Sequence, residues 1–298
     1  MTNRVSSHDR ATLDMPFPRL SEGRFSSYAA LTDDALYEKT GVRIAFTQRT
    51  GGVSEPPFDS FNLGGHVGDD PACVSRNRDI LLEGIGAPDA FVIQPNQVHG
   101  DRVVVCERRQ DVETCSARAR EGADGVVVRA SDVAAILCFA DCVPIIAVSP
   151  AGSFAVVHAG WRGVVAHIAE KAVDMLCAAD GVDASAVNVY IGAHIEACCF
   201  EVGEDVAARF ANEFGACALA RPRHVDMTAA LVAGLASHGV DTRRIACAHV
   251  CTMCDSEGRY YSYRRSAGVC GRHAAAAVRV SQDERSGASC RSNDAMPL

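Results

Sequence analysis

The middle of the chain contains a close series of short apolar segments separated by turn residues, and this series constrains the fold most. The segments lie at 125–129, 134–139, 145–148 and 154–158. Their length and spacing are typical of buried β-strands. Further strands are predicted at 42–46, 91–98, 102–106, 187–191 and 245–250, and helical spacing occurs at 70–84, 164–176, 205–214 and 227–238. The sequence therefore predicts a sheet-centred α+β fold.

The composition is that of an ordinary globular protein. The chain has 298 residues, of which 48% are hydrophobic and 22% charged. This length is enough for one large domain with a sizeable core. Residues 1–20 and 282–298 are polar and are predicted to be loose tails. We expect residues 21–281 to form a single catalytic domain, because they contain no Ser- or Pro-rich linker and no repeat.

The net charge and the hydropathy pattern disfavour nucleic acid and membranes as partners. Lys and Arg number 29 and Asp and Glu 37, a net charge of −8, which disfavours binding to nucleic acid or an anionic membrane. The longest apolar stretch, 133–148, is interrupted by Asp141 and Pro144 and is shorter than the roughly 20 residues of a membrane-spanning helix. Pro144 is expected to prevent simple continuation of a central strand. No signal-peptide core is recognisable, so a cytoplasmic location with mostly reduced cysteines is expected.

Three predicted strands end close to side chains that can bind a metal or act as nucleophiles. These side chains are His99, Cys142 and His158, and Asp141 precedes the cysteine. Two imidazoles and one thiolate suit zinc, and three protein ligands leave an open position, as in catalytic zinc sites. Each residue also has a structural interpretation, as a hydrogen-bonded histidine or a buried thiol. A third interpretation makes Cys142 a thiolate nucleophile with a histidine base.

Other segments carry weaker signals. Arg264 and Arg265, followed by Gly271 and Arg272, lie in a basic stretch that could hold a phosphate through paired N–H donors, or could be a solvated turn. Arg49 and Asn62, in glycine-containing loops, are either ligand-facing or simple turn residues. The C-x-x-C pair at 251 and 254 is interpreted as buried thiols rather than a redox or zinc site. The adjacent cysteines at 198 and 199 are expected to point apart in extended chain.

Taken together, the motifs resemble those of the YfiH-like proteins, also called laccase-domain or polyphenol oxidase proteins. The matching stretches occur in one order from about 44 to 273. They are T-Q-R-T-G-G-V-S (47–54), S-F-N-L-G (60–64), H-V-G-D (66–69), N-Q-V-H-G (96–100), A-D-G (123–125), A-D-C-V-P (140–144), V-H-A-G-W-R-G (157–163), E-V-G (201–203), C-T (251–252), S-Y-R-R (262–265) and G-R (271–272).

This resemblance implies a single-domain α-β sandwich with mixed sheets flanked by helices, and a zinc ion held by His99, Cys142 and His158. It also implies a purine nucleoside phosphorylase acting on adenosine, inosine and methylthioadenosine, with an accompanying adenosine deaminase activity. Purine nucleoside and phosphate are then the expected partners. We expect Arg49, Asn62, Arg264 and Arg265 to bind substrate or phosphate, and Asp141 to tune Cys142 or relay a proton.

The sequence departs from the family at one loop, and three different functions compete with the phosphorylase. The family's usual G-P-x-I-G near 192 is replaced by Gly-Ala-His-Ile-Glu at 192–196, which adds His194. A copper-dependent polyphenol oxidase is disfavoured because none of the ten histidines forms an H-x-H pair, although the His₂Cys set could bind copper. The same residues also suit a Cys or zinc hydrolase that edits peptidoglycan, or a zinc-stabilised interaction protein without activity. The sequence assigns no oligomeric state.

Overall fold

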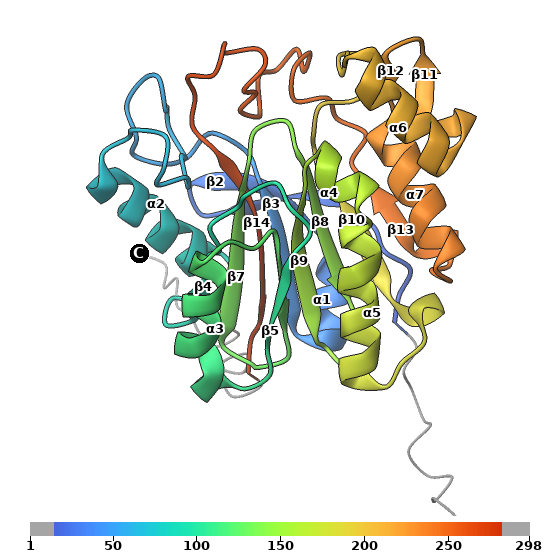
Figure 1. Ribbon diagram of the computed structural model, residues 1–298. Coiled ribbons are helices and arrows are strands. Elements are labelled where there is room, and N and C mark those ends of the chain that lie inside the picture. Colours follow the sequence, from blue (N-terminus) through green and yellow to red (C-terminus); the bar gives the residue numbers. More distant parts are fainter. Residues whose placement is uncertain (1–14, 282–298) are drawn as a thin grey trace, which may run out of the picture.

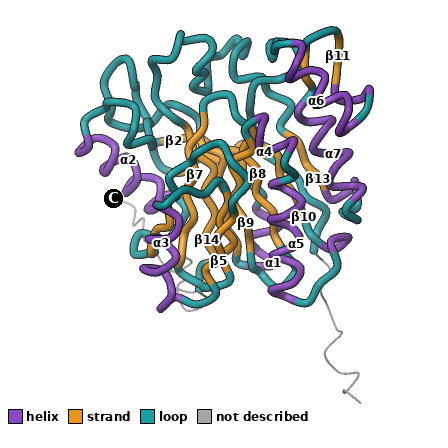
Figure 2. The backbone as a smooth tube through the Cα atoms, in the orientation of Figure 1, coloured by secondary structure: helices purple, strands orange, loops and turns teal. Residues whose placement is uncertain are grey.

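The computed structural model describes residues 15–281, which form one domain built around two stacked sheets (Figures 1 and 2). The first six-stranded sheet has the order β1-β2-β3-β14-β7-β4. Its strands are β1 (Ser21–Phe25), β2 (Tyr28–Thr32), β3 (Val42–Thr47), β4 (Phe91–Ile93), β7 (Val133–Phe139) and β14 (His273–Arg279). Only the pairing of β4 with β7 is parallel in this sheet.

The second six-stranded sheet has the order β13-β10-β8-β9-β6-β5. Its strands are β5 (Val103–Cys106), β6 (Gly125–Val128), β8 (Val143–Val148), β9 (Phe154–Ala159), β10 (Asn188–Ile191) and β13 (Ile245–Cys247). The outer pairs β5–β6 and β10–β13 are parallel and the inner pairs are antiparallel. β11 (Leu219–Arg221) and β12 (His224–Val225) form a separate small hairpin. The predicted α+β fold with mixed sheets is confirmed.

Strand β7 shows how the first sheet is buried on both faces. Its residues Val133, Ala135, Leu137 and Phe139 belong to the core between the two sheets, and the residues between them face the core on the other side. Because side chains alternate along a strand, one continuous apolar run supplies both cores.

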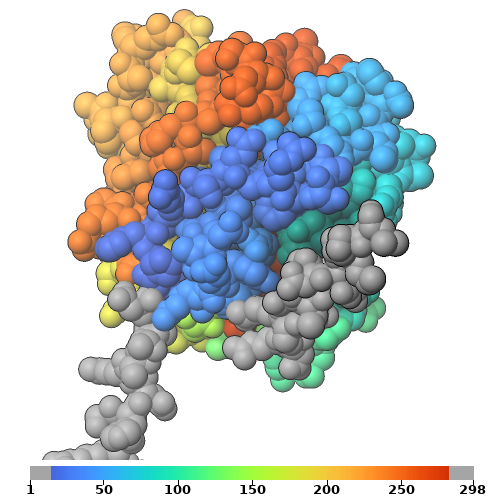
Figure 3. Space-filling view, turned by 180° about the vertical axis from the view of Figure 1, so that it is seen from behind, coloured from blue at the N-terminus to red at the C-terminus, as the bar shows by residue number. Residues whose placement is uncertain are grey.

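Helices cover the outer faces. α2 (Pro71–Gly84) packs on the first sheet, whereas α4 (Trp161–Val165), α5 (Ile168–Asp180) and α7 (Met227–Ser237) cover the second. α1 (Asp34–Thr40) and α3 (Val112–Arg120) lie at the ends of the inter-sheet core, and α6 (Glu204–Phe214) packs beside α7. Seen from behind, the N-terminal elements, in blue, cover the centre of that face (Figure 3). In the described part of the chain, no helix combines the length and apolar composition needed to cross a membrane.

Several predicted boundaries need correction. The helix predicted at 164–176 is two helices, α4 and α5, because His167 has a left-handed backbone (φ 58°) that interrupts the helical hydrogen bonds. The strand predicted at 91–98 ends at Ile93, two residues before Pro95, which lacks an N–H group. Pro144 does not interrupt its strand, because it lies at the second position of β8, beyond the last ladder pair with β10.

Residues 15–20 were predicted to belong to the loose N-terminal tail, yet they are held by hydrogen bonds. The side chain of Asn188 donates to the Pro16 carbonyl at 2.9 Å, and the Arg19 N–H donates to Asp33 at the same distance. The Met15 side chain is buried in the inter-sheet core. The rest of that tail and the predicted C-terminal tail at 282–298 lie outside the described residues.

Candidate active site

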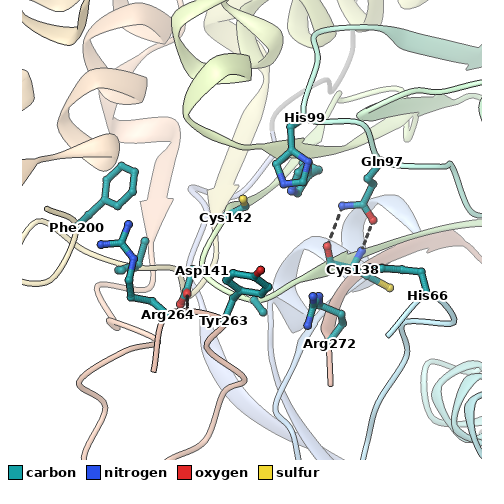
Figure 4. A pocket seen from close by; sticks show the side chains of 13 residues that line it. His66, Gln97, His99, Cys138, Asp141, Cys142, Phe200, Tyr263, Arg264 and Arg272 are labelled. Carbon is teal, nitrogen blue, oxygen red and sulfur yellow. Dashed lines mark hydrogen bonds between the residues drawn. The ribbon is translucent and has the colours of Figure 1, made fainter. Parts of the chain in front are cut away.

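His99, Cys142 and His158 are brought together at one end of the two sheets, where Figure 4 labels the first two. His99 lies in the loop after β4, Cys142 in the connection from β7 to β8, and His158 in β9. Their potential ligand atoms all lie within 4.8 Å of one another. The two imidazole rings are 4.8 Å apart and perpendicular, with an interplanar angle of 86°. The structure therefore assembles the three side chains that the sequence singled out.

The carboxylate of Asp124 orients this trio. Its Oδ1 accepts hydrogen bonds from His158 Nδ1 at 2.8 Å and from the His99 N–H at 3.0 Å, and its Oδ2 accepts from the Gly100 N–H at 2.7 Å. Asp124 is completely buried. Since Nδ1 of His158 donates to a carboxylate, Nε2 is the nitrogen left to bind a ligand. The sequence alone gave Asp124 no role, although it lies in the A-D-G motif.

The electrostatics of the trio favour an ionised thiol. Burial alone would raise the pKa of the Cys142 thiol, but the neighbouring His158 and His99 lower it to about 6. Burial alone would lower the pKa of His158, but Cys142 and Asp124 raise it to about 9. The site therefore stabilises a thiolate, which is the form of cysteine that binds metals and acts as a nucleophile.

Asp141 holds the surrounding loops together. Its backbone has a positive φ of 89°, and its carboxylate accepts from the Thr252 hydroxyl at 2.6 Å and from the Arg264 N–H at 2.7 Å. Both oxygens thus have protein partners. In this structure Asp141 fixes the position of the 251–264 loop beside the Cys142 connection. The expected role of Asp141 in relaying a proton stays a prediction.

A cavity of about 410 Å³ opens beside the trio. Its size suits a small organic ligand. Its walls combine cationic, amide and aromatic side chains: His66, Gln97, Cys138, Tyr263, Arg264, Arg272 and Phe200, together with Ala140, Asp141, Ile195 and the trio. A smaller cavity of about 110 Å³ shares His99 and Cys142 with it and is also lined by Trp161 and Met227.

Of the four residues predicted to bind substrate or phosphate, only Arg264 lines the larger cavity. Arg265 is turned away and donates to the Tyr260 carbonyl at 2.8 Å. Arg49 is likewise occupied elsewhere, because its guanidinium donates to the carbonyl and carboxylate of Asp59.

Asn62, the fourth predicted residue, is fully buried and acts on the cavity indirectly. Its Oδ1 accepts from the Arg272 N–H at 2.8 Å and from the Gly64 N–H at 3.1 Å. Asn62 therefore positions the backbone of Arg272, whose side chain lines the cavity while Nη1 of its guanidinium donates to the carbonyls of Cys270 and Gly271 at 2.8 and 3.0 Å.

Sequence reasoning missed further cavity residues. Arg272 was noted with the basic stretch that could hold a phosphate but was not among the four residues predicted to bind substrate, and Gln97 stood out only as part of N-Q-V-H-G. The Gln97 amide is fixed by two hydrogen bonds with the Cys138 backbone, at 2.8 and 2.9 Å. The motif position of Arg272 could have indicated its role, because it follows a glycine just before β14. Nothing local in the sequence singles out the aromatic wall of Phe200 and Tyr263.

The unusual His194 is not part of the cavity wall. It is buried, with Nδ1 2.9 Å from the Gly192 carbonyl and Nε2 3.1 Å from the Thr228 hydroxyl. The imidazole therefore packs and bonds within the fold.

The donor set of the trio fits a zinc or copper ion. One thiolate and two imidazoles are ligands that both metals accept, and the Asp124–His158 pair is the arrangement in which a carboxylate orients a metal-binding histidine. Gly160 backs the trio closely, since a Cβ there would stand 3.1 Å from His99 Cδ2 and 3.5 Å from Cys142 Sγ. A cluster of histidine and cysteine that could hold a metal is thus present.

Comparison with known proteins gives concordant results. The family model described as multi-copper polyphenol oxidoreductase laccase matches residues 43–280. Purine nucleoside phosphorylase Rv2149c from Mycobacterium tuberculosis is 35% identical over 231 residues, which is 76% of this chain and 88% of that protein. Purine nucleoside phosphorylase YlmD from Geobacillus stearothermophilus is 33% identical over 243 residues, 78% of this chain and 88% of that protein.

Solved structures agree with the fold. The crystal structure of YlmD from Geobacillus stearothermophilus is similar with a TM-score of 0.75 and 29% identity, covering 89% of this chain and 99% of that one. The YfiH protein of Bacillus licheniformis gives a TM-score of 0.74 at 26% identity, covering 86% and 98%.

Proposed function

The chain belongs to the laccase-domain family of YfiH-like proteins, and from that premise we propose that it is a zinc-dependent purine nucleoside phosphorylase. Its substrates are adenosine, inosine and methylthioadenosine, and its products are the free purine base and the pentose 1-phosphate. An adenosine deaminase activity accompanies phosphorolysis. Relatives named purine nucleoside phosphorylase support the activity.

The observation that carries the proposal is the meeting of the trio with a cationic cavity. A thiolate and two imidazoles occupy one wall, and the side chains of Arg264 and Arg272 line the same cavity of about 410 Å³. An ordinary structural metal site is closed by four ligands and has no adjoining cavity, whereas three ligands beside a cavity are typical of a catalytic site. Two arginines in that cavity provide binding for an anion such as phosphate.

His99, Cys142 and His158 are the residues that would hold the zinc ion. When bound, zinc supplies Lewis acidity at the wall of the cavity. Asp124 contributes by keeping the Nδ1 proton of His158 in place, so that Nε2 faces the site.

Phosphorolysis replaces one bond at the sugar carbon C1′ with another. The bond between C1′ and the purine nitrogen breaks, a bond between C1′ and a phosphate oxygen forms, and the base leaves with a ring proton that the hydrogen phosphate supplies overall. Positive charge develops on the sugar, so an anion held close to C1′ stabilises the transition state. Arg264 and Arg272 bind and orient that phosphate in this proposal. The guanidinium of Arg264 is itself held by the Glu201 carbonyl at 3.0 Å.

Aromatic side chains supply the apolar part of the cavity. Phe200 and Tyr263 offer ring faces on which a purine can stack. Deamination needs water to attack adenine C6 and ammonia to leave. The six-membered ring of the base must therefore face the cavity wall formed by the trio. The amide of Gln97 is fixed by the Cys138 backbone, which makes it a rigid part of that wall.

Two observations favour different activities as second candidates. The lowered pKa of Cys142 beside His158 also suits a cysteine hydrolase, such as one that edits peptidoglycan. The description of the matching family model, a polyphenol oxidoreductase, suits a copper-dependent oxidase that uses the same His₂Cys set.

Product analysis distinguishes these candidates. Full-length protein with quantified metal is incubated with adenosine, with and without inorganic phosphate, and the products are separated by chromatography. We expect adenine and ribose 1-phosphate only when phosphate is present, and inosine in both cases. Inosine and methylthioadenosine are tested in the same way.

The matched variants are Cys142→Ala and Cys73→Ser, the latter on the outer surface of α2. C142A is expected to lose the zinc ion of the trio and both activities, and C73S to keep them. Survival of all three nucleosides with zinc bound at the trio would refute the proposal, as would a C142A variant that has lost this ion and remains fully active. Stoichiometric alkylation of Cys142 in metal-free, amide-cleaving protein would favour the hydrolase.

A further inference from the structure

Four cysteines form a second cluster near, but outside, the catalytic trio. Their Sγ atoms all lie within 4.8 Å of one another, and those of Cys198 and Cys254 are 3.5 Å apart. Cys199 and Cys251 complete the cluster. The sequence-based expectation that the adjacent cysteines point apart is wrong, because residues 197–199 form a turn rather than extended chain. In that turn the Cys199 N–H donates to the Glu196 carbonyl at 2.9 Å.

Parallel strand pairing explains how the two pairs of cysteines meet. β10 and β13 run parallel and adjacent, so the segments that follow them leave the same edge of the sheet. Beyond the strands, the His194 N–H donates to the Val250 carbonyl at 3.2 Å, and the Thr252 N–H donates to the His194 carbonyl at 2.9 Å. The backbone alone therefore places the four thiols together.

We propose that Cys198, Cys199, Cys251 and Cys254 bind a structural zinc ion in a closed tetrahedral site. Zinc–sulfur bonds of about 2.3 Å require sulfur atoms roughly 3.8 Å apart in a tetrahedron. The separations in this cluster, from 3.5 Å for one pair to at most 4.8 Å, bracket that value. Small side-chain rotations are enough to close the site. Four thiolates saturate the coordination, as in structural zinc sites.

The local hydrogen bonds support ligand formation by Cys251. The Glu196 N–H donates to its sulfur at 3.5 Å. Burial would raise the pKa of this thiol, but the N–H groups of Glu196, Cys254 and Met253 lower it. In contrast, burial and the neighbouring thiols raise the pKa of Cys199 to about 11. Four thiolates this close repel one another strongly, so a cation is needed if all are to ionise.

Such an ion would join two walls of the catalytic cavity. Cys199 immediately precedes Phe200, which lines the cavity. Cys251 immediately precedes Thr252, whose hydroxyl donates to Asp141. The proposed role is thus to fix the loop after β10 against the loop after β13. A disulfide between Cys198 and Cys254, whose sulfur atoms are 3.5 Å apart, is the competing outcome that the intact mass below tests.

Metal stoichiometry tests this proposal in the full-length protein, purified under reducing conditions without chelators. We expect two zinc ions per chain in the wild type, one in Cys142→Ser and one in the double variant C198S/C254S. A triple variant combining all three changes is expected to bind none. The matched control is C73S/C177S, which removes two thiols outside both clusters and should retain two zinc ions. If the trio binds no zinc, the wild type and Cys142→Ser both hold one ion and C198S/C254S holds none. If the four cysteines bind none, the wild type and C198S/C254S both hold one and Cys142→Ser holds none, so the two proposals fail in different patterns.

A second measurement does not depend on the folding of any variant. Titration of wild-type protein with an organomercurial and a metallochromic zinc indicator should release two zinc ions in separable steps. Cobalt-reconstituted protein should show the intense thiolate charge-transfer absorption of a four-sulfur site, and C198S/C254S should lose it. One zinc per chain in the wild type, unchanged in C198S/C254S, would overturn the proposal. So would an intact mass 2 Da below that of the reduced chain, which indicates a disulfide.

Discussion

Replacing Asp124 with asparagine tests whether this carboxylate orients the metal ligands. Asp124 accepts four hydrogen bonds, from His158 Nδ1 and from the N–H groups of residues 98–100. Asparagine keeps the shape but turns one of the two acceptor oxygens into an NH₂ group. Whichever way the amide is oriented, two of the four donors lose their acceptor.

The magnitude follows from the partners lost. A hydrogen bond to a charged group contributes about 1.5–3 kcal/mol, so losing two should lower the free energy of unfolding by about 3–6 kcal/mol. If the NH₂ group faces His158, Nδ1 must accept a hydrogen bond, the ring proton moves to Nε2, and that nitrogen no longer binds metal. Loss of such an orienting carboxylate typically weakens metal binding about 10- to 100-fold.

The assay is equilibrium competition for zinc against a chromophoric chelator, following the binding step that Cys142→Ser abolishes. Asp33→Asn is the matched control. Asp33 is also buried and accepts from the Leu36 N–H at 3.0 Å and the Tyr190 hydroxyl at 2.8 Å, but it does not line the catalytic cavity. We expect D33N to lower stability and leave zinc affinity unchanged. If D124N binds zinc within twofold of the wild type while losing stability like D33N, the reasoning is refuted.

Two further predictions concern a binding arginine and a pH-dependent histidine. In steady-state assays, Arg264→Gln should raise the KM for phosphate on the order of tenfold, because it removes a charged donor. Arg265→Gln is the control and should leave this KM unchanged, because the Arg265 side chain does not line the cavity. Equal KM values for phosphate in the two variants would contradict the assignment. Burial lowers the pKa of His167, but Glu213 at 2.7 Å and Glu170 at 3.2 Å raise it above its usual value. The charged imidazole therefore stabilises the fold fully below about pH 6.5, and this contribution is lost as pH rises through the raised pKa. In urea unfolding, His167→Asn should have a lower free energy of unfolding than the wild type at about pH 5.5, and the difference should be much smaller at about pH 9. The same difference in free energy of unfolding at both pH values would exclude the ion pairs of His167 as its cause.

Local sequence signals were sufficient to predict most strands of the inter-sheet core, because they are short, apolar and bounded by turns. They were not sufficient for β14, a central strand of the first sheet with the sequence H-A-A-A-A-V-R. Alanine favours helices intrinsically, and here only pairing with β3 and β7 makes the segment a strand. Small side chains suit a strand packed between other layers, but that need is visible only in the folded protein.

The same distinction applies to the site. The trio was predictable because His99, Cys142 and His158 are chemically distinctive and each lies near the end of a predicted strand. Arg49 and Arg265 could not be separated from Arg264 in this way, because all three are arginines in polar loops. Only the tertiary contacts show that Asp59 and the Tyr260 carbonyl occupy the first two.

The trio lies where the chain crosses between the sheets: His158 belongs to β9 of the second sheet, whereas His99 and Cys142 lie in the connections from β4 to β5 and from β7 to β8, each of which passes from the first sheet to the second. A metal ion would bind there only when the two sheets are packed together, because neither sheet alone supplies the complete site. Thermodynamic linkage then adds the binding free energy to the stability of sheet docking, by about 2.7 kcal/mol when free metal is at 100 times its dissociation constant. Metal supply would in this way set how firmly the halves of the sandwich stay together.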